Sequence, residues 1–584
     1  MPIAKDNRER PVDNTKSKEG VFSMRRKKLV TLIGSVCLIL VLAALPFMAA
    51  CPAPAEEEAP AEKSVLRGAW IEMPPSGRNA LMANAATDWG WQTLFYEPLW
   101  IPTLAGDFVP WLAKSWEYKE DEKAWIIYLD ERATWSDGEP VTAEDVKFSF
   151  EACFEHNFTA GGPLGPFVDS IQVVDDHTVR FNMVGDYVHF LMEVGFVFIV
   201  PEHIWGQYDD ISQYEDPYKD RVGSGPFLYK ELKVGQYLHV VKDPNYWRGP
   251  VAIDEVVYRI YTNEEAMFMA LLKGELDMIS NIRGTFGAIP LLEADPDINF
   301  VELQGSYTIH LGHNHRIYPL GIKEVRQAIS LAVDRQPIID TAFMGYAEYP
   351  LMGFFPPCYE AYANTDLVWP GLDMTDEERI AAANAILDDL GFKPGKDGIR
   401  VTDKGTKMEF DLVMPNWADF IRAGEMIKLD LKKIGIEINV LPLDPGTLYS
   451  GLVYNPERSM DWDLMGPHNS TVKGIKYYCA EFGPWGDPPN PWANAVAYGF
   501  QDEELQPLLA QINRTMDEEE RIELMMRAQE LFSEILPTVP LGHKSELYAY
   551  RTDKFTGWDN TPIMQGGLSF PTCSLLNLTS LRPK

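Results

Sequence analysis

The chain has 584 residues, of which 46% are hydrophobic and 12% aromatic, so it is large enough to bury more than one core. Its formal net charge of −34 argues against nucleic-acid binding, since no segment resembles a basic patch, and it chiefly favours solubility. Its cysteines form no Cys-x-x-Cys pair, which argues against a cysteine zinc site.

A basic cluster at residues 25–28 opens the first recognisable segment, and a nearly uncharged apolar run follows it up to Cys51. Because small residues precede the cysteine, this order predicts a signal peptide over residues 1–50, with Met24 as an alternative start. The apolar run is nearly long enough to span a bilayer, so an uncleaved anchor and ordinary secretion remain alternatives.

The residues around Cys51 favour lipid attachment. Residues 48–50, Met-Ala-Ala, resemble the lipobox of bacterial lipoproteins, in which the cysteine is diacylated and becomes the new N-terminus. Residues 51–63 are rich in Pro and Glu and cannot bury apolar area, which predicts an extended, solvated linker. We therefore expect a lipid-anchored domain outside the cytoplasm, held off the membrane by an acidic linker.

Strand and helix patterns alternate along the rest of the chain, which predicts an α/β protein. Residues 125–129, WIIYL, read as a strand, and the turn residues Ser-Asp-Gly at 136–138 follow. Thr142 then caps a helix, with Asp145 as its capping-box partner.

Further helices are predicted over residues 324–336, 376–390 and 517–536, stopped by Pro337, Gly391 and Pro537 respectively. In the first of these, Arg326 and Asp334 are expected to pair or to cap locally. Strands over residues 408–415 and 436–443 flank a helix over residues 418–435, which makes a βαβ unit.

Four cysteines, Cys153, Cys358, Cys479 and Cys573, lie far apart after the linker. They allow up to two disulfides in an oxidising compartment, and the sequence does not fix the pairing.

Several segments in order carry a family resemblance: TWSDGEPVTAEDVKFSF at 134–150, GSGPFLYKE at 223–231, VRQAISLAVDR at 325–335 and RAQELFSEILPTVPL at 527–541. With them, almost the whole chain after the linker resembles the extracytoplasmic solute-binding proteins of the peptide/nickel type, the receptors of ABC importers. The resemblance implies a monomer that delivers a small solute to a permease and ATPase, with no cofactor and no catalysis.

The same resemblance implies a two-lobed α/β fold of the class II periplasmic-binding-protein type, with two crossovers and a ligand cleft between the lobes. Lobe I is expected over 64–303 plus 541–584 and lobe II over 304–540. The crossovers are expected near residues 302–309 and 536–543. Closure of the lobes about the crossovers would trap the solute.

By analogy with the family, three loops should face the cleft. They carry Asp88, Trp89 and Trp91 in the first loop, Asn416 and Trp417 in the second, and His468 and Asn469, after Gly466, in the third. For each tryptophan, a place in the core is an equally good interpretation.

The ligand is predicted to be a peptide, with an oligosaccharide as the alternative. Peptide-binding members of the family hold the ligand amine with an acid in the third loop, and residues 467–474, PHNSTVKG, contain none. Asp88 could supply that charge. Sugars pack on Trp and hydrogen-bond to Asp, Asn and His, which the three loops offer.

A metal or metal chelate is a second alternative, because His310, His313 and His315 lie close together in sequence. On a strand, His313 and His315 would share a face while His310 points the other way. None of the motifs GxSxG, HExxH, GxxxxGK[ST] and GxGxxG is present, and no carboxylate pair is singled out as a glycosidase site, so an enzyme is the least favoured class.

Overall fold

The computed structural model describes the chain from Lys63 onward with several gaps. The described residues are 63–70, 79–82, 90–104, 106–158, 160–214, 219, 221–280, 282, 284, 286–359, 361–470, 474–483, 497–563 and 574–584. Lys63–Lys584 forms one compact unit, and residues 1–62 lie outside the described residues. The predictions for the signal peptide, Cys51 and the linker up to Glu62 fall in that part.

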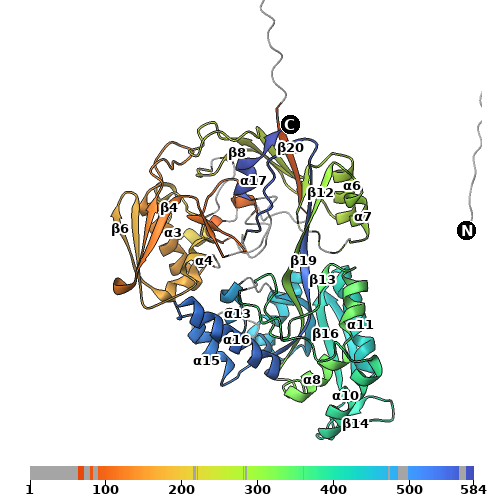
Figure 1. Cartoon of the computed structure of the whole chain (residues 1–584). Helices are drawn as coiled ribbons and strands as arrows, with labels where there is room; N and C mark the ends of the chain where they lie inside the picture. Colours follow the sequence, from red (N-terminus) through yellow and green to blue (C-terminus); the bar gives the residue numbers. More distant parts are fainter. Residues whose placement is uncertain are drawn as a thin grey trace, which may run out of the picture. The chain divides into compact units, whose positions relative to one another are not determined.

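An antiparallel sheet of four strands follows early in the chain (Figure 1). Its strands, in spatial order, are β4 (Ala113–Lys119), β5 (Ala124–Leu129), β7 (Thr178–Met183) and β6 (Val168–Asp175). The predicted strand over 125–129 is therefore confirmed as β5. Helix α3 (Ala143–His156) contacts β6 and β7 and carries the buried side chains Val146 and Phe150 toward the core.

The predicted turn and cap at the start of α3 are confirmed. Gly138 has φ of 97°, a conformation that favours glycine. Asp145 accepts the Thr142 backbone N–H at 2.8 Å and, from further along the chain, the Glu202 backbone N–H at 2.8 Å. Trp135 Nε1 donates to the same carboxylate at 3.3 Å. One buried acid thus joins the turn, the helix start and a later loop.

A second sheet contains β1 (Val65–Trp70), β10 (Glu255–Ile260), β9 (Tyr237–Lys242) and β8 (Phe227–Lys233) in that order. Both sheets share one hydrophobic core, which also takes in Tyr548 and Leu578 from the end of the chain. Glu97 lies fully buried in this part and accepts from Trp111 Nε1 at 2.6 Å, Tyr246 Oη at 2.5 Å and Trp247 Nε1 at 2.7 Å. Burial raises the pKa of the Glu97 carboxyl.

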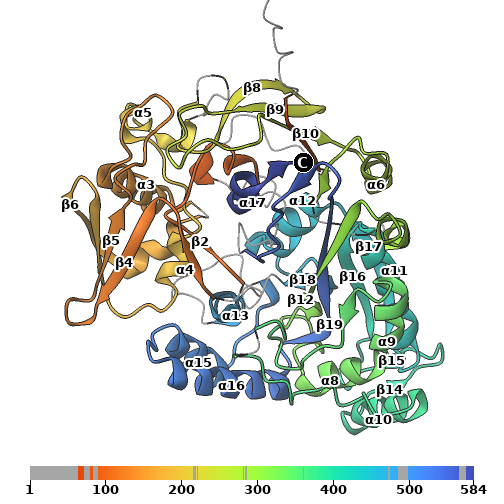
Figure 2. The same cartoon turned by 45° about the horizontal axis from the view of Figure 1, so that its top comes forward.

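A larger sheet of seven strands organises the rest of the molecule. Its path is β11 (Met278–Ile279), β19 (Thr538–Arg551), β12 (Ile298–His313), β18 (Leu464–Ser470), β16 (Glu409–Pro415) and β17 (Glu437–Leu443), with β13 (Ala347–Glu348) paired to β19. β16 and β17 are parallel, and α11 (Ala418–Lys432) connects them and packs on β17 (Figure 2). The predicted βαβ unit is therefore confirmed.

The two long strands β12 and β19 are antiparallel and pair in two stretches. Residues 298–303 pair with 546–551, and residues 307–312 pair with 538–544. The ladder is interrupted between Leu303 and Tyr307, where Gly305 has φ of 58°. A pair of strands with an internal break is a suitable place for a bend, because the β12–β19 pairing is interrupted there.

A second core fills the space around the larger sheet and its helices. These helices are α8 (Lys323–Ala332), α10 (Asp376–Asp389) and α11. Helices α13 (Gly474–Phe482), α15 (Leu505–Ile512) and α16 (Glu518–Ile535) supply a further cluster of buried side chains. The predicted ends of α10 and α16 are confirmed: Gly391 has φ of 78°, and Leu536, with φ of 54°, ends α16 directly before Pro537.

The predicted end of the first helix at Pro337 is wrong. α8 ends at Ala332, Val333 is extended, and Asp334 caps a new short helix, α9 (Arg335–Pro337), through the Gln336 N–H. Pro337 sits in the first turn of this helix, where a missing N–H costs nothing. Arg326 does not pair with Asp334; its guanidinium donates to the carbonyls of Leu320, Ile535 and Leu536.

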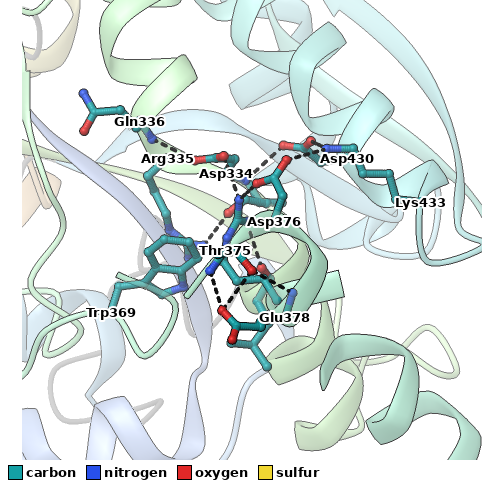
Figure 3. A network of polar contacts seen from close by, with 12 residues as sticks. Asp334, Arg335, Gln336, Trp369, Thr375, Asp376, Glu378, Asp430 and Lys433 are labelled. Carbon is teal, nitrogen blue, oxygen red and sulfur yellow. Dashed lines mark hydrogen bonds and ion pairs between the residues drawn. The ribbon is translucent and has the colours of Figure 1, made fainter. Parts of the chain in front are cut away.

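Arg335 explains why the chain breaks here (Figure 3). Its buried guanidinium donates to the carbonyls of Ser330, Val333 and Pro540, and it lies 4.3 Å from the centroid of the Trp369 ring. The contact with Pro540 ties the turn to β19. Burial lowers the pKa of Arg335 to about 9.

Carboxylates around this turn join three helices. Arg379 of α10 pairs with Asp334 at 2.7 Å and with Asp376. Asp430 of α11 accepts the Asp334 N–H at 3.0 Å and pairs with Lys433 at 2.8 Å (Figure 3). This network is structural: it fixes α8, α10 and α11 around one turn.

Cys153 and Cys479 are buried free thiols, and burial raises the pKa of both. Disulfides that use either residue are therefore not formed. Cys573 lies outside the described residues.

Candidate functional site

The loop between β16 and α11 carries two predicted site residues. Asn416 is exposed, and its backbone N–H donates to the carbonyl of Leu443 at 2.9 Å. Trp417 is the N-cap residue of α11 and is partly buried, with its ring 5.2 Å from that of Phe420. The loop lies at the carboxyl end of a parallel strand, where ligands bind in open α/β sheets.

A buried ion pair lies directly beside this loop. Asp419, in the first turn of α11, is 0% exposed and contacts Lys544 Nζ of β19 at 2.8 Å. Lys544 is 6% exposed and lies 5.3 to 5.7 Å from the centroids of the Phe286, Phe343 and Phe420 rings. The pair connects the candidate loop to β19 next to the break in its pairing with β12.

The third predicted loop is part of a strand. His468 and Asn469 lie on β18, opposite His310 and Ile309 of β12. Between these pairs and the next, two β18 residues face one β12 residue, and Gly466 has φ of 136°. This bulge bends β18 just before the predicted site residues, as bulges next to binding sites do. The side chains of residues 467–470 lie outside the described part.

Of the three site residues predicted in the first loop, only Trp91 lies within the described residues; Asp88 and Trp89 do not. Trp91 is 1% exposed and packs in the first core, with its ring 4.8 Å from that of Trp70. Trp70 in turn stacks on Tyr258 at 4.5 Å. Of the two interpretations of Trp91, a residue facing the cleft or a core residue, the structure shows the core residue.

Two acids, Asp461 and Asp463, precede the third predicted loop in the sequence, and both have partners within the protein. Asp461 contacts Arg458 at 2.9 Å. Asp463 is half-buried and accepts the Asp411 backbone N–H at 2.9 Å, and burial raises the pKa of its carboxyl.

The three histidines of the metal alternative do not share a strand face, because β12 ends at His313. His310 Nε2 contacts Tyr498 Oη at 2.9 Å, and His315 Nε2 donates to the carbonyl of Pro537 at 2.8 Å. His310 and His313 are fully buried, and His315 is partly buried. Burial lowers the pKa of His315 to about 3 and also lowers the pKa of His313. Within the described ranges, no three His, Cys, Asp or Glu side chains gather to hold a metal ion.

Sequence reasoning missed the pair of Asp419 and Lys544. One signal was available: a lysine inside the long strand over 538–551 has to find a partner, because a buried ammonium is costly when unpaired. Nothing in the sequence named Asp419 as that partner.

The comparisons with known proteins identify the family. Residues 107–491 match the family model for bacterial extracellular solute-binding proteins, family 5. The chain belongs to this family. Its fold is the two-lobed α/β fold of periplasmic binding proteins, and its class is the solute-binding receptor of ABC importers.

Individual relatives bind different solutes. The nickel-binding periplasmic protein of Escherichia coli is 25% identical over 371 residues, 62% of this chain and 68% of the relative. The oligopeptide-binding protein AppA of Bacillus subtilis, solved with a nonapeptide, has a TM-score of 0.73 at 20% identity and covers 89% of this chain and 99% of its own. A mannohexaose-bound periplasmic oligopeptide-binding protein of Thermotoga maritima has a TM-score of 0.72 at 22% identity, covering 90% and 99%.

Members of this family are extracytoplasmic binding proteins that work with a permease and an ATPase. Among the described helices, none is both long and apolar enough to cross a membrane.

Proposed function

We propose that the protein captures a peptide between its lobes and delivers it to the permease of an ABC importer. Lobe I comprises 64–303 plus 541–584, and lobe II comprises 304–540. The observation that carries the proposal is the likeness over 89% of the chain to a receptor solved with a nonapeptide. The break in the β12–β19 ladder supports a hinge at the proposed crossovers.

The proposed ligand contacts are Asp88, Trp89, Asn416, Trp417, His468 and Asn469, with Trp91 supporting the first loop from the core. Asp88 would hold the peptide amine, because Asp419 is buried against Lys544 and cannot meet a ligand.

A thermal-shift screen of the purified protein against di- and oligopeptides tests the proposal. A ligand at a hundredfold excess over its Kd stabilises the native state by about 2.7 kcal/mol, so the melting temperature rises by several degrees. The shift should vanish in Asp88→Ala and persist in the control Asp461→Ala. No shift with any peptide, or a shift that Asp88→Ala leaves intact, would contradict the peptide assignment.

An oligosaccharide is the second candidate, favoured by the loop after β16. Its accessible groups are an amide and an indole, and both nearby acids on the approach to β18 are engaged within the protein. An indole and an amide suit the C–H faces and hydroxyls of a sugar. A thermal shift with mannohexaose that is lost in Trp417→Ala and largely kept in Trp417→Phe would establish this reading over the peptide.

We further propose that Cys51 carries a lipid that anchors the monomeric receptor to the outer face of the cell membrane after removal of residues 1–50. Expression in bacteria treated with globomycin, which blocks the lipoprotein signal peptidase, should yield a larger precursor. Cys51→Ser should release the protein from the membrane fraction. Unchanged size and attachment in both experiments would contradict the anchor.

A further inference from the structure

The segment around α4 (Phe190–Val194) makes polar contacts with helices that follow far later in the chain. The Val188 N–H donates to the carbonyl of Asn513 at 3.1 Å, and His189 Nε2 contacts Asn513 Oδ1 at 2.9 Å. Glu193 contacts Lys476 of α13 at 2.8 Å. Asn513 directly follows α15, and both views draw α4 next to α13 (Figures 1 and 2).

The side chains that make these contacts are buried, as in a protein interior. Glu193 is 2% exposed, and it also accepts from Tyr187 Oη at 3.2 Å. His189 is 7% exposed, and the Lys476 ammonium lies 5.5 Å from the Phe196 ring centroid. Surface ion pairs contribute little, but a buried pair is strongly coupled to its surroundings, because removing one partner leaves an uncompensated charge.

The contacts join the two proposed lobes at a place separate from the crossovers. Val188, His189 and Glu193 belong to lobe I, whereas Lys476 and Asn513 belong to lobe II. A second buried pair between the proposed lobes, Lys544 with Asp419, lies next to the crossover near residues 536–543.

We propose that Val188, His189 and Glu193 with Lys476 and Asn513 form an interlobe latch that holds the receptor closed. The latch rests on the proposed two-lobed function and adds a determinant of closure to it. The latch residues determine how easily the lobes open, although none of them has to contact the solute.

The latch also senses pH through His189. The charged and titratable groups around the imidazole are Tyr187, Glu193, Lys476 and, from α16, Arg521. Burial, with the nearby Lys476 and Arg521 cations, lowers the pKa of His189 to about 3 when the latch is closed. Opening exposes the ring to water, so the open form takes up a proton near pH 6.5. Acid therefore favours opening, and the closed form is fully favoured only above that pH.

Hydrogen exchange of the ligand-free protein, followed by mass spectrometry on peptides spanning residues 184–196, tests the latch. In the wild type at pH 7.5 these amides should be protected. Lys476→Met leaves Glu193 buried and unpaired, so their exchange should rise about tenfold or more. The double variant Glu193→Gln/Lys476→Met carries no unpaired charge and should stay within about threefold of the wild type.

Peptides from β7 and β16 serve as internal controls, because each lies within one proposed lobe; their exchange should not change. At pH 5.5 the opening of wild type, corrected for intrinsic rates, should increase about tenfold, and His189→Gln should remove this increase. Unprotected amides at 184–196 in the wild type, or equal exchange in Lys476→Met and the double variant, would overturn the latch. Because no solute is added, failure of the ligand screen would contradict the proposed function without affecting this result.

Discussion

At the scale of single residues, the molecule depends on a few buried charges whose partners come from distant segments. Glu97, Asp419 and Glu193 are each at most 2% exposed, and each has donors on other elements. The ion pairs of Asp419 and Glu193 add little net stability compared with apolar residues of the same shape. They specify which segments meet, because removing one partner leaves a buried charge uncompensated.

The pair of Asp419 and Lys544 offers the sharpest test at this scale. Lys544→Met should lower the free energy of unfolding by about 3–5 kcal/mol, because Asp419 is left buried and unpaired. Asp419→Asn/Lys544→Met should recover most of that loss. Urea unfolding followed by far-UV circular dichroism measures both.

A matched surface pair provides the control. Lys407 and Asp397 lie 2.6 Å apart but are 48% and 44% exposed. Lys407→Met should cost at most about 1 kcal/mol. If both lysine variants lose the same stability, the special role of the buried pair is refuted.

At the scale of elements, caps and turns decide where the helices begin and end. The start of α3 and the start of α10 both carry a capping box, at Thr142–Asp145 and at Thr375–Glu378. They differ in burial: Asp145 is 4% exposed and serves two further donors, whereas Glu378 is exposed and serves Thr375 alone.

Because of this difference in burial and partners, replacing the two acids by alanine should lower the free energy of unfolding by different amounts. Glu378→Ala removes only a cap and should cost about 1 kcal/mol. Asp145→Ala also removes the acceptor of the buried Trp135 Nε1–H and of the Glu202 backbone N–H, and should cost about 3 kcal/mol. Thermal and urea unfolding of the two variants measure the gap, and equal losses would show that the contacts beyond the cap contribute nothing.

At the scale of the whole molecule, buried neutral histidines couple stability to pH. Burial lowers the pKa of His189, His315 and His543 to about 3 each. The folded form binds no proton there while the unfolded chain protonates near pH 6.5, so stability is full above pH 6.5 and falls toward pH 3. Buried acids such as Glu97 and Asp145, whose pKa is raised, act in the opposite sense.

One variant isolates the histidine contribution. The His543 ring accepts the Leu351 N–H at Nε2 at 3.0 Å, and a glutamine oxygen can replace that acceptor without titrating. Between pH 7.5 and 5.5, wild type should lose about 1.4 kcal/mol more than His543→Gln. Parallel stability curves for the two proteins would contradict the assignment of a buried neutral imidazole.

Features that depend on local sequence pattern could be predicted without the structure. Alternating and helical periodicities located β5, α3 and the β16–α11–β17 unit, and the resemblance spread over the chain identified the family. Local chemistry is sufficient there, because a turn glycine or a cap acts on residues a few positions away. The same logic failed at Pro337, where Arg335 bonds to β19 and breaks the helix early.

Contacts between residues far apart in the sequence became known only from the three-dimensional fold. It put Trp91 in a core, separated the histidines of the metal alternative, joined Asp419 to Lys544 and brought α4 against α13 and the end of α15. Partners 125 and 324 positions apart in sequence leave no periodic trace. Their contact is fixed by how strands and helices pack, because a buried charge or ring is satisfied by whichever segment the fold brings to it.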